Sequence, residues 1–262
     1  MRIKFVLILV GLILPLGLAL GAEGSLESTD LANLAEQNEN WVSSGLNLTA
    51  AQNVTEKVYE TWYEEGINLL AQGKNDQATR CFNESIQMNP NNAPAWFAKG
   101  EALRRQNRYN AAIKCFNETL KINPSDSAAW DNKGIALSDQ GKYDESIKCF
   151  DEAIRISPNN TKALNNKGWS LYEIGKYNES IVYADKSLGI NSNEASTWDT
   201  KGEALAALGR YNESIVCFSK ATEIDPKAGM IWFHKGEALK AAGRISEANA
   251  TFSRASELGY RE

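Results

Sequence analysis

Residues 127–160 read SAAWDNKGIALSDQGKYDESIKCFDEAIRISPNN, and the pattern of this stretch returns along the chain every 34 residues. Trp130 and Leu137 are seven positions apart, which places them on one face of a first helix. Phe150 and Ala153 follow at the spacing of the apolar face of a second helix. The stretch therefore predicts a helical hairpin.

Phased columns of side chains show that this hairpin is repeated six times without an insertion. Glycine inside a helix costs about 1 kcal/mol relative to alanine, so its recurrence indicates helices that approach too closely for a side chain. The tryptophan column is Trp62, Trp96, Trp130, Trp198 and Trp232, with Leu164 in the gap, and the glycines are Gly66, Gly100, Gly134, Gly168, Gly202 and Gly236. The phenylalanine column is Phe82, Phe116, Phe150, Phe218 and Phe252, with Ala184 as its exception, and Pro90, Pro124, Pro158 and Pro226 close four repeats.

These columns resemble the tetratricopeptide repeat (TPR), whose pattern is W-x2-L-G-x2-Y, then A-x3-F, then P in 34 residues. The resemblance implies an all-α fold, a right-handed α-solenoid of six antiparallel helix-turn-helix hairpins. The predicted repeats are residues 59–92, 93–126, 127–160, 161–194, 195–228 and 229–262. Lysine stands where the family usually has leucine (Lys99, Lys133, Lys167, Lys201 and Lys235), and we expect its methylenes to lie along the hairpin with the ammonium in water.

The N-terminus predicts export. Arg2 and Lys4 precede an apolar run from Phe5 to Ala22, which is typical of a secretory signal and just long enough to span a membrane. Residues 1–22 are therefore a signal peptide or an N-terminal signal anchor, and both place the rest of the chain outside the cell or at its surface. Residues 23–58 are a polar linker, with an amphipathic pattern that fits either a capping helix or a flexible stalk.

The composition argues against catalysis, a cofactor and nucleic-acid binding. The net charge is −5, so no bulk positive field attracts nucleic acid. The chain has one histidine, His234, which leaves little for a catalytic triad or a His-based zinc site. No segment outside the repeats is long enough for a catalytic domain, and no phosphate-binding glycine loop is present. We predict no enzyme activity, no cofactor and no metal, and membrane contact only through an uncleaved N-terminal segment.

The four cysteines share one repeat column. Equivalent sites in stacked hairpins are about 10 Å or more apart, whereas bridged Cα atoms lie within about 7 Å. We therefore expect free thiols that act as small hydrophobic residues in a reducing or anaerobic setting. They are Cys81, Cys115, Cys149 and Cys217.

Candidate glycosylation sites are more numerous than the composition predicts. A bland reading is that asparagine suits a helix start, whereas the repeat phase puts four of the sites on the outer face of second helices, where sugars would leave the groove clear. The sequons begin at Asn47, Asn53, Asn83, Asn117, Asn159, Asn178, Asn212 and Asn249.

In the family that the chain resembles, ligands lie along the concave surface lined by first helices. Carried onto this chain, the inward positions of the third to fifth repeats are acidic and rich in amides, which suits a protein or peptide with a basic or polar segment and not the terminal carboxylate that the family's chaperone-tail clamp binds. The predicted groove consists of Asp131, Asn132, Asp139, Asn165, Asn166, Trp169, Tyr172, Glu173, Asp199, Thr200 and Glu203.

Two readings of this surface remain open at the level of sequence. The first is an exported non-catalytic scaffold that binds its partner in the groove at or outside the cell surface. The alternative is a structural spacer or a self-associating envelope component without a dedicated peptide ligand. Trp169 belongs to the ligand surface in the first reading, but it also fits a core residue that compensates for the missing Trp and Phe of the fourth repeat.

Overall fold

A computed structural model describes the backbone of residues 48–260 and the side chains of residues 57–260. The predicted signal segment and the amphipathic part of the linker lie outside these residues. The described part is helical throughout and contains no strand. Its helices are α3 (Leu48–Ala71), α4 (Asn75–Met88), α5 (Ala93–Arg105), α6 (Tyr109–Ile122), α7 (Ser127–Ser138), α8 (Tyr143–Ile156), α9 (Thr161–Glu173), α10 (Tyr177–Ile190), α11 (Ala195–Ala207), α12 (Tyr211–Ile224), α13 (Gly229–Ala241) and α14 (Ile245–Glu257).

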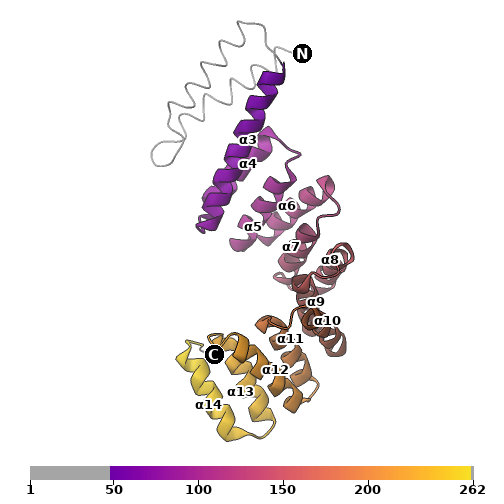
Figure 1. Cartoon of the computed structure of the whole chain (residues 1–262), viewed down its shortest axis with the longest axis vertical. Helices are drawn as coiled ribbons and strands as arrows, with labels where there is room; N and C mark the ends of the chain where they lie inside the picture. The colour runs from indigo at the N-terminus through magenta and orange to yellow at the C-terminus, as the bar shows by residue number, and fades with distance from the viewer. Residues whose placement is uncertain (1–47, 261–262) are drawn as a thin grey trace. The chain divides into compact units, whose positions relative to one another are not determined.

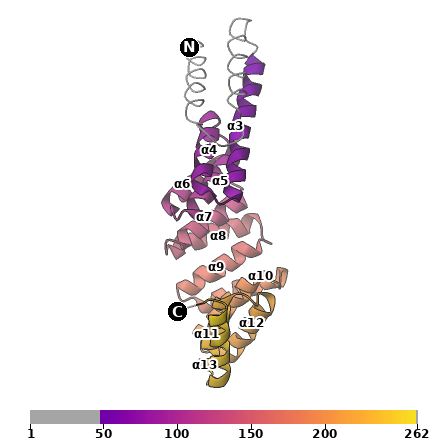
Figure 2. The same ribbon diagram turned by 90° about the vertical axis from the view of Figure 1, so that its left-hand side faces the viewer.

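The chain divides into two units, Met1–Glu60 and Thr61–Glu262, and the second unit carries the hairpins. From α5 onward, each first helix packs against the second helix of its own hairpin, and each second helix also packs against the next first helix. Figures 1 and 2 show this succession of helix pairs. The fold is therefore the α-solenoid of helical hairpins that the repeat pattern predicts. Helix α3 begins at Leu48 and extends into the segment expected to be linker.

The turns inside the hairpins explain one glycine column. Two or three positions after the end of each first helix, the turn residue has φ between 73° and 77° where it is glycine, a left-handed conformation that glycine adopts without steric cost. Asn107 takes this place in the second hairpin with φ 58°, and its side chain accepts a hydrogen bond from the Tyr109 hydroxyl at 2.9 Å. The glycines are Gly73, Gly141, Gly175, Gly209 and Gly243.

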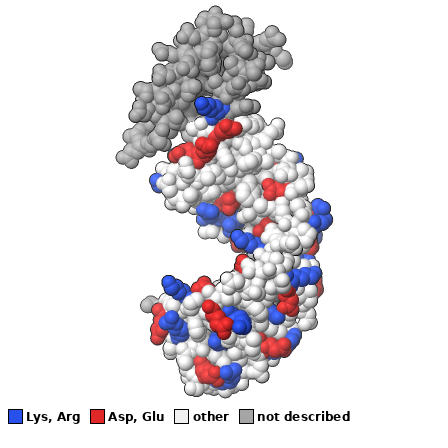
Figure 3. Space-filling view, viewed as in Figure 1, with Lys and Arg blue, Asp and Glu red and all other residues white. Residues whose placement is uncertain are grey.

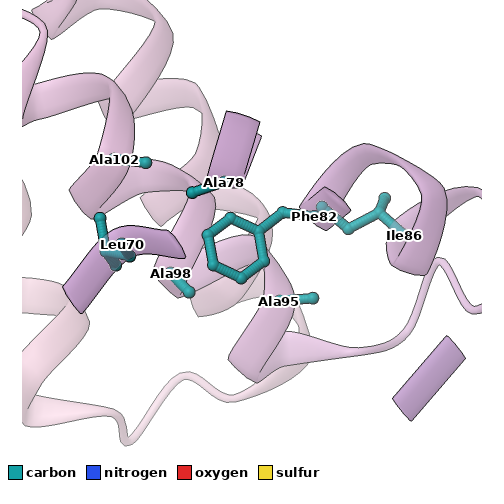
Figure 4. Close-up of a cluster of buried hydrophobic side chains, with 7 residues drawn as sticks. All are labelled: Leu70, Ala78, Phe82, Ile86, Ala95, Ala98 and Ala102. Carbon is teal, nitrogen blue, oxygen red and sulfur yellow. The ribbon is translucent and has the colours of Figure 1, made fainter. Parts of the chain in front are cut away.

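The phenylalanine column forms the core of the hairpins and explains the glycines inside the first helices. Phe82 is fully buried, and Figure 4 shows its ring among alanine side chains of its own helix, α4, and of the next helix, α5. A Cβ on Gly66 would lie 2.5 Å from Cε1 of this ring. The same pairing recurs as Gly100–Phe116, Gly134–Phe150, Gly202–Phe218 and Gly236–Phe252. The glycines therefore make room for a ring of their own hairpin.

The lysine column makes contacts with tryptophan rings that the sequence did not predict. Lys99 lies over the ring of Trp96, with 4.9 Å from Nζ to the ring centroid, and the same cation–π contact recurs in three other hairpins. The ammonium groups therefore pack on tryptophan faces instead of only entering water. Trp96 in turn donates from Nε1 to the carbonyl of Pro90 at 2.9 Å, so each such tryptophan ties a first helix to the preceding loop.

The fourth hairpin lacks this tryptophan and holds its lysine in another way. Lys167 is buried, 2.5 Å from the carboxylate of Asp151, and donates to the hydroxyl of Tyr183 at 2.7 Å. Burial alone would lower the pKa of Lys167, but the bonds to Asp151 and Tyr183 raise it above its usual value. The lysine thus remains charged and links the third hairpin to the fourth.

The four cysteines are buried and unpaired, as the repeat spacing predicts. Burial raises the pKa of Cys81, Cys149 and Cys217 to about 11, and it also raises the pKa of Cys115. A thiol with a pKa of about 11 is about one part in a thousand thiolate at pH 8, and the thiolate is the reactive form.

We therefore expect a thiol-specific reagent at pH 8 to modify the native protein slowly and to count four thiols as soon as urea unfolds the chain. Raising the pH toward 11 should speed the native reaction as the thiolate fraction grows. Rapid modification of all four thiols in the native protein would contradict their burial. Fewer than four reactive thiols after unfolding without reductant would reveal a disulfide.

Candidate functional site

The inner surface of the array is formed by first helices. The first helices α5, α7, α9 and α11 each contact the next first helix, up to α13, whereas no two second helices from α4 to α14 contact each other. Inward side chains of neighbouring repeats consequently lie together. On the face shown in Figure 3, acidic and basic side chains are interspersed over the described repeats.

Helices α7 and α9 bring two of the predicted groove residues into contact. Asp131 is 7% exposed and accepts a hydrogen bond from Nδ2 of Asn166 at 3.1 Å. Burial raises the pKa of Asp131, while the bond from Asn166 and the charges of Lys162 and Arg104 oppose the rise.

Two other groove residues of α7 have different partners. Asn132 is turned to its own helix, where Nδ2 donates to the carbonyl of Ala128 at 3.0 Å. Asp139 follows α7 and lies 3.9 Å from Arg104 of α5. The second repeat thus adds positive charge beside this part of the acidic strip.

An aromatic cluster occupies the middle of the predicted groove. The rings of Trp169 and Tyr172 lie 5.3 Å apart, and Tyr177 lies 5.6 Å from Tyr172. The pKa of Tyr172 is raised to about 12, mainly by burial and further by the negative charges of Glu203 and Glu173. The rings therefore stand in a field that favours a positive ligand.

Trp169 does not replace the missing phenylalanine of its hairpin. A Cβ on Gly168 would find the carbonyl oxygen of Ser180 at 3.4 Å, the backbone nitrogen of Ala184 at 3.6 Å and Cγ2 of Thr200 at 3.7 Å as its nearest neighbours. No ring covers this glycine as Phe150 covers Gly134. Trp169 packs against Tyr172 instead, and its part in a ligand surface stays a prediction.

Two carboxylates of α11 meet the one histidine of the chain. Oδ1 of Asp199 lies at hydrogen-bond distance, 3.0 Å, from Nδ1 of His234. Oε1 of Glu203 lies 3.7 Å from Nε2 of the same ring. Burial raises the pKa of Glu203 to about 7, with His234 opposing the rise and Asp199 and Glu173 adding to it. Burial would lower the pKa of His234, but its carboxylate partners raise it.

Sequence reasoning assigned His234 no role. The missed signal is a spacing: Asp131 and Asn166 are 35 residues apart, and so are Asp199 and His234. Both pairs join the same positions of neighbouring first helices. By contrast, Thr200 is buried and its hydroxyl donates to the carbonyl of Ser196 at 3.0 Å, so it adds little to the predicted groove.

Two side-chain oxygens at the predicted groove positions are buried without a hydrogen-bond partner. They are Oδ1 of Asn165 and Oε2 of Glu203. An unsatisfied buried polar atom costs about 1–3 kcal/mol, so a donor or a cation that reaches these oxygens would be favoured. Both belong to first helices, α9 and α11.

The candidate glycosylation sites differ in exposure. Asn83, Asn159, Asn178, Asn212 and Asn249 are exposed, whereas Asn117 is half-buried. Asn178 and Asn212 are the second residues of α10 and α12, which Lys176 and Arg210 precede as cap residues without a side-chain cap bond. Asn178 and Asn212 therefore lie at helix starts, as the bland reading has it, but not at the cap positions. Asn47 and the side chain of Asn53 lie outside the described residues.

Comparison with known proteins establishes the family. Models of the tetratricopeptide repeat match residues 63–127, 127–160, 149–182 and 195–228, which together make up more than half of the chain. The chain belongs to the tetratricopeptide repeat family. No curated protein sequence matches it. In the part that the structure describes, no helix is both long and apolar enough to cross a membrane.

Solved structures with the same fold include PilW, MamA and YrrB. PilW, a widely conserved type IV pilus biogenesis factor, matches with a TM-score of 0.71 at 18% identity, over 78% of this chain and 96% of that chain. MamA from Desulfovibrio magneticus RS-1 matches with a TM-score of 0.57 at 21% identity, over 64% and 94%. YrrB, described as a TPR protein with an unusual peptide-binding site, matches with a TM-score of 0.53 at 20% identity, over 68% and 91%. At these identities the likeness shows the fold alone.

Proposed function

We propose that this protein is an exported, non-catalytic scaffold that binds a basic or polar segment of another protein along its first helices. The observation that carries the proposal is the aromatic cluster of Trp169, Tyr172 and Tyr177 beside the carboxylates of Glu173 and Glu203. The proposal of export rests on the basic start and apolar run of residues 1–22.

The cluster combines two features of a peptide anchor. Aromatic side chains bury a large area at a low entropic cost and dominate many interfaces. The surrounding carboxylates favour Lys or Arg, which can place a cation on an aromatic face while pairing with an acid. Peptide binding by YrrB gives a precedent on the same fold, and here we extend it to this chain.

A pair of charge reversals tests the groove. Glu173→Lys changes the charge beside Tyr172, and Glu145→Lys makes the same change at an exposed position near the start of α8. An array of extended peptides that carry Lys or Arg, with Glu-substituted copies, supplies the probe. We expect the natural chain to bind the basic peptides. Glu173→Lys should weaken this binding several-fold, whereas Glu145→Lys should leave it unchanged.

Removal of the rings should have a larger effect. Trp169→Ala combined with Tyr172→Ala should cost about 2 kcal/mol of binding free energy, or about thirtyfold in Kd, as for a central aromatic anchor. Equal retention of acidic peptides, or loss of binding only with Glu145→Lys, would overturn the proposal. Concentration-dependent self-association in sedimentation without peptide binding would instead support the spacer function.

A further inference from the structure

His234 is the only histidine in the chain, and it lies between two carboxylates of the preceding first helix. Asp199 and Glu203 are one helical turn apart on α11, so they face the same side of it. His234 comes from α13, which contacts α11 directly. Two helices of neighbouring repeats thus aim three side chains at one place.

The three side chains are largely withdrawn from water. Their side-chain exposures are 9% for Asp199, 14% for Glu203 and 20% for His234. Within residues 57–260, neither carboxylate has an ion pair with a lysine or an arginine. Oε2 of Glu203 is buried and accepts no hydrogen bond. A cation that enters the cluster would therefore satisfy a polar atom that the protein leaves without a partner.

We propose that Asp199, Glu203 and His234 form a binding site for one divalent transition-metal ion of the Zn²⁺ type. One ring nitrogen of His234 and one oxygen from each carboxylate all lie within 4.8 Å of one another. Ligands at about 2.0–2.2 Å from Zn²⁺ are about 3.3–3.6 Å apart, so the most distant ligand atoms must approach by about 1.2–1.5 Å. Asp199 lies at Nδ1 and Glu203 at Nε2, so the ring must also turn one nitrogen toward both carboxylates. The imidazole favours Zn²⁺, Co²⁺ or Ni²⁺ over Mg²⁺ and Ca²⁺, which prefer oxygen ligands alone.

Charge and proton balance are compatible with such an ion. Two carboxylates neutralise a dication, and the imidazole binds it in the neutral form, so the proton that His234 shares with the carboxylates leaves to solvent. Solvent water completes the coordination. The bound ion would join α11 to α13 and so link the fifth repeat to the sixth. This inference does not depend on peptide binding by the groove.

The chain contains its own comparison two repeats earlier. Sixty-eight residues before the cluster, the corresponding positions hold Asp131, Ile135 and Asn166. Asp131 bonds Asn166 at 3.1 Å, much as Asp199 bonds His234 at 3.0 Å, so asparagine fits this place. The earlier set lacks the imidazole and the second carboxylate. His234→Asn is therefore a variant that should fold normally and lose the ion.

The test uses the full chain purified without a histidine tag and titrated with Zn²⁺ alone. A single histidine gives a single set of imidazole signals in long-range ¹H–¹⁵N spectra, so the report is specific to His234. We expect one Zn²⁺ per chain by calorimetry and a shift of that set of signals. His234→Asn and Glu203→Gln should each weaken binding about tenfold or more, with circular dichroism spectra unchanged.

Two controls separate this site from other ligands. Asn166→His builds the Asp–His pair beside Ile135 without a second carboxylate, and it should add no second Zn²⁺. Co²⁺ in place of Zn²⁺ should give no thiolate charge-transfer absorption, which excludes the buried cysteines as ligands. Zn²⁺ affinity that is unchanged in His234→Asn, thiolate absorption with Co²⁺, or unshifted His234 signals at millimolar Zn²⁺ would each overturn the proposal.

Discussion

Phe150→Ala is expected to lower the free energy of unfolding by about 3–5 kcal/mol, the cost of removing a fully buried ring from a packed core. Phe150 has no exposed surface and fills the space above Gly134. Because an array unfolds by repeats, the loss should appear as a shift of the urea midpoint followed by circular dichroism.

The last repeat provides the matched control. Phe252 occupies the same place above Gly236 but is half-buried, because no seventh hairpin covers it among the described residues. Phe252→Ala should shift the midpoint clearly less than Phe150→Ala. Equal shifts would mean that the ring is not stabilised by its enclosure between hairpins.

Gly134→Ala is expected to destabilise the array by about 1–3 kcal/mol, although alanine is the better helix former. The added Cβ would lie 2.6 Å from Cε1 of Phe150 and 2.8 Å from Cδ1, and the buried ring has no room to move away. Urea unfolding again gives the measurement.

The opposite sign is expected for the same substitution in the fourth repeat. A Cβ on Gly168 meets no atom closer than 3.4 Å, because Ala184 replaces the phenylalanine. Gly168→Ala should therefore stabilise the helix by up to about 1 kcal/mol through lower unfolded-state entropy. Destabilisation by both substitutions would show that the glycines serve close contact between helix backbones and not the ring.

The fold could be predicted from the sequence because each structural contact of the hairpin recurs. Phe150 and Gly134 are sixteen residues apart in the same way as Phe82 and Gly66, so the columns report the packing before any coordinate is known. The turn glycines could equally be predicted, because each of these turns needs a residue in the left-handed conformation. Periodicity carries this information only where the repeats agree.

The candidate site depends on residues in which the repeats differ, and there the sequence is less informative. The inward positions could be assigned by phase, but the pairing of Asp199 with His234 requires the offset between neighbouring first helices. The same holds for Lys99 on Trp96, where the partly exposed ammonium also makes a cation–π contact that the sequence did not predict. Repeat phase predicts where a side chain points, whereas its partner depends on how two helices are set against each other.

The strictly neighbouring contacts of the array also bear on how fast it forms. In the described part of the chain, the most distant hydrogen-bonded partners are 35 residues apart, as for Arg105 and the carbonyl of Leu70. Contacts of such short sequence separation close small loops, and proteins built from them fold in microseconds to milliseconds. Each hairpin can therefore form as soon as it and its predecessor are available. A chain that is delivered end first, as by synthesis or by passage through a membrane, can fold progressively without waiting for its last residue.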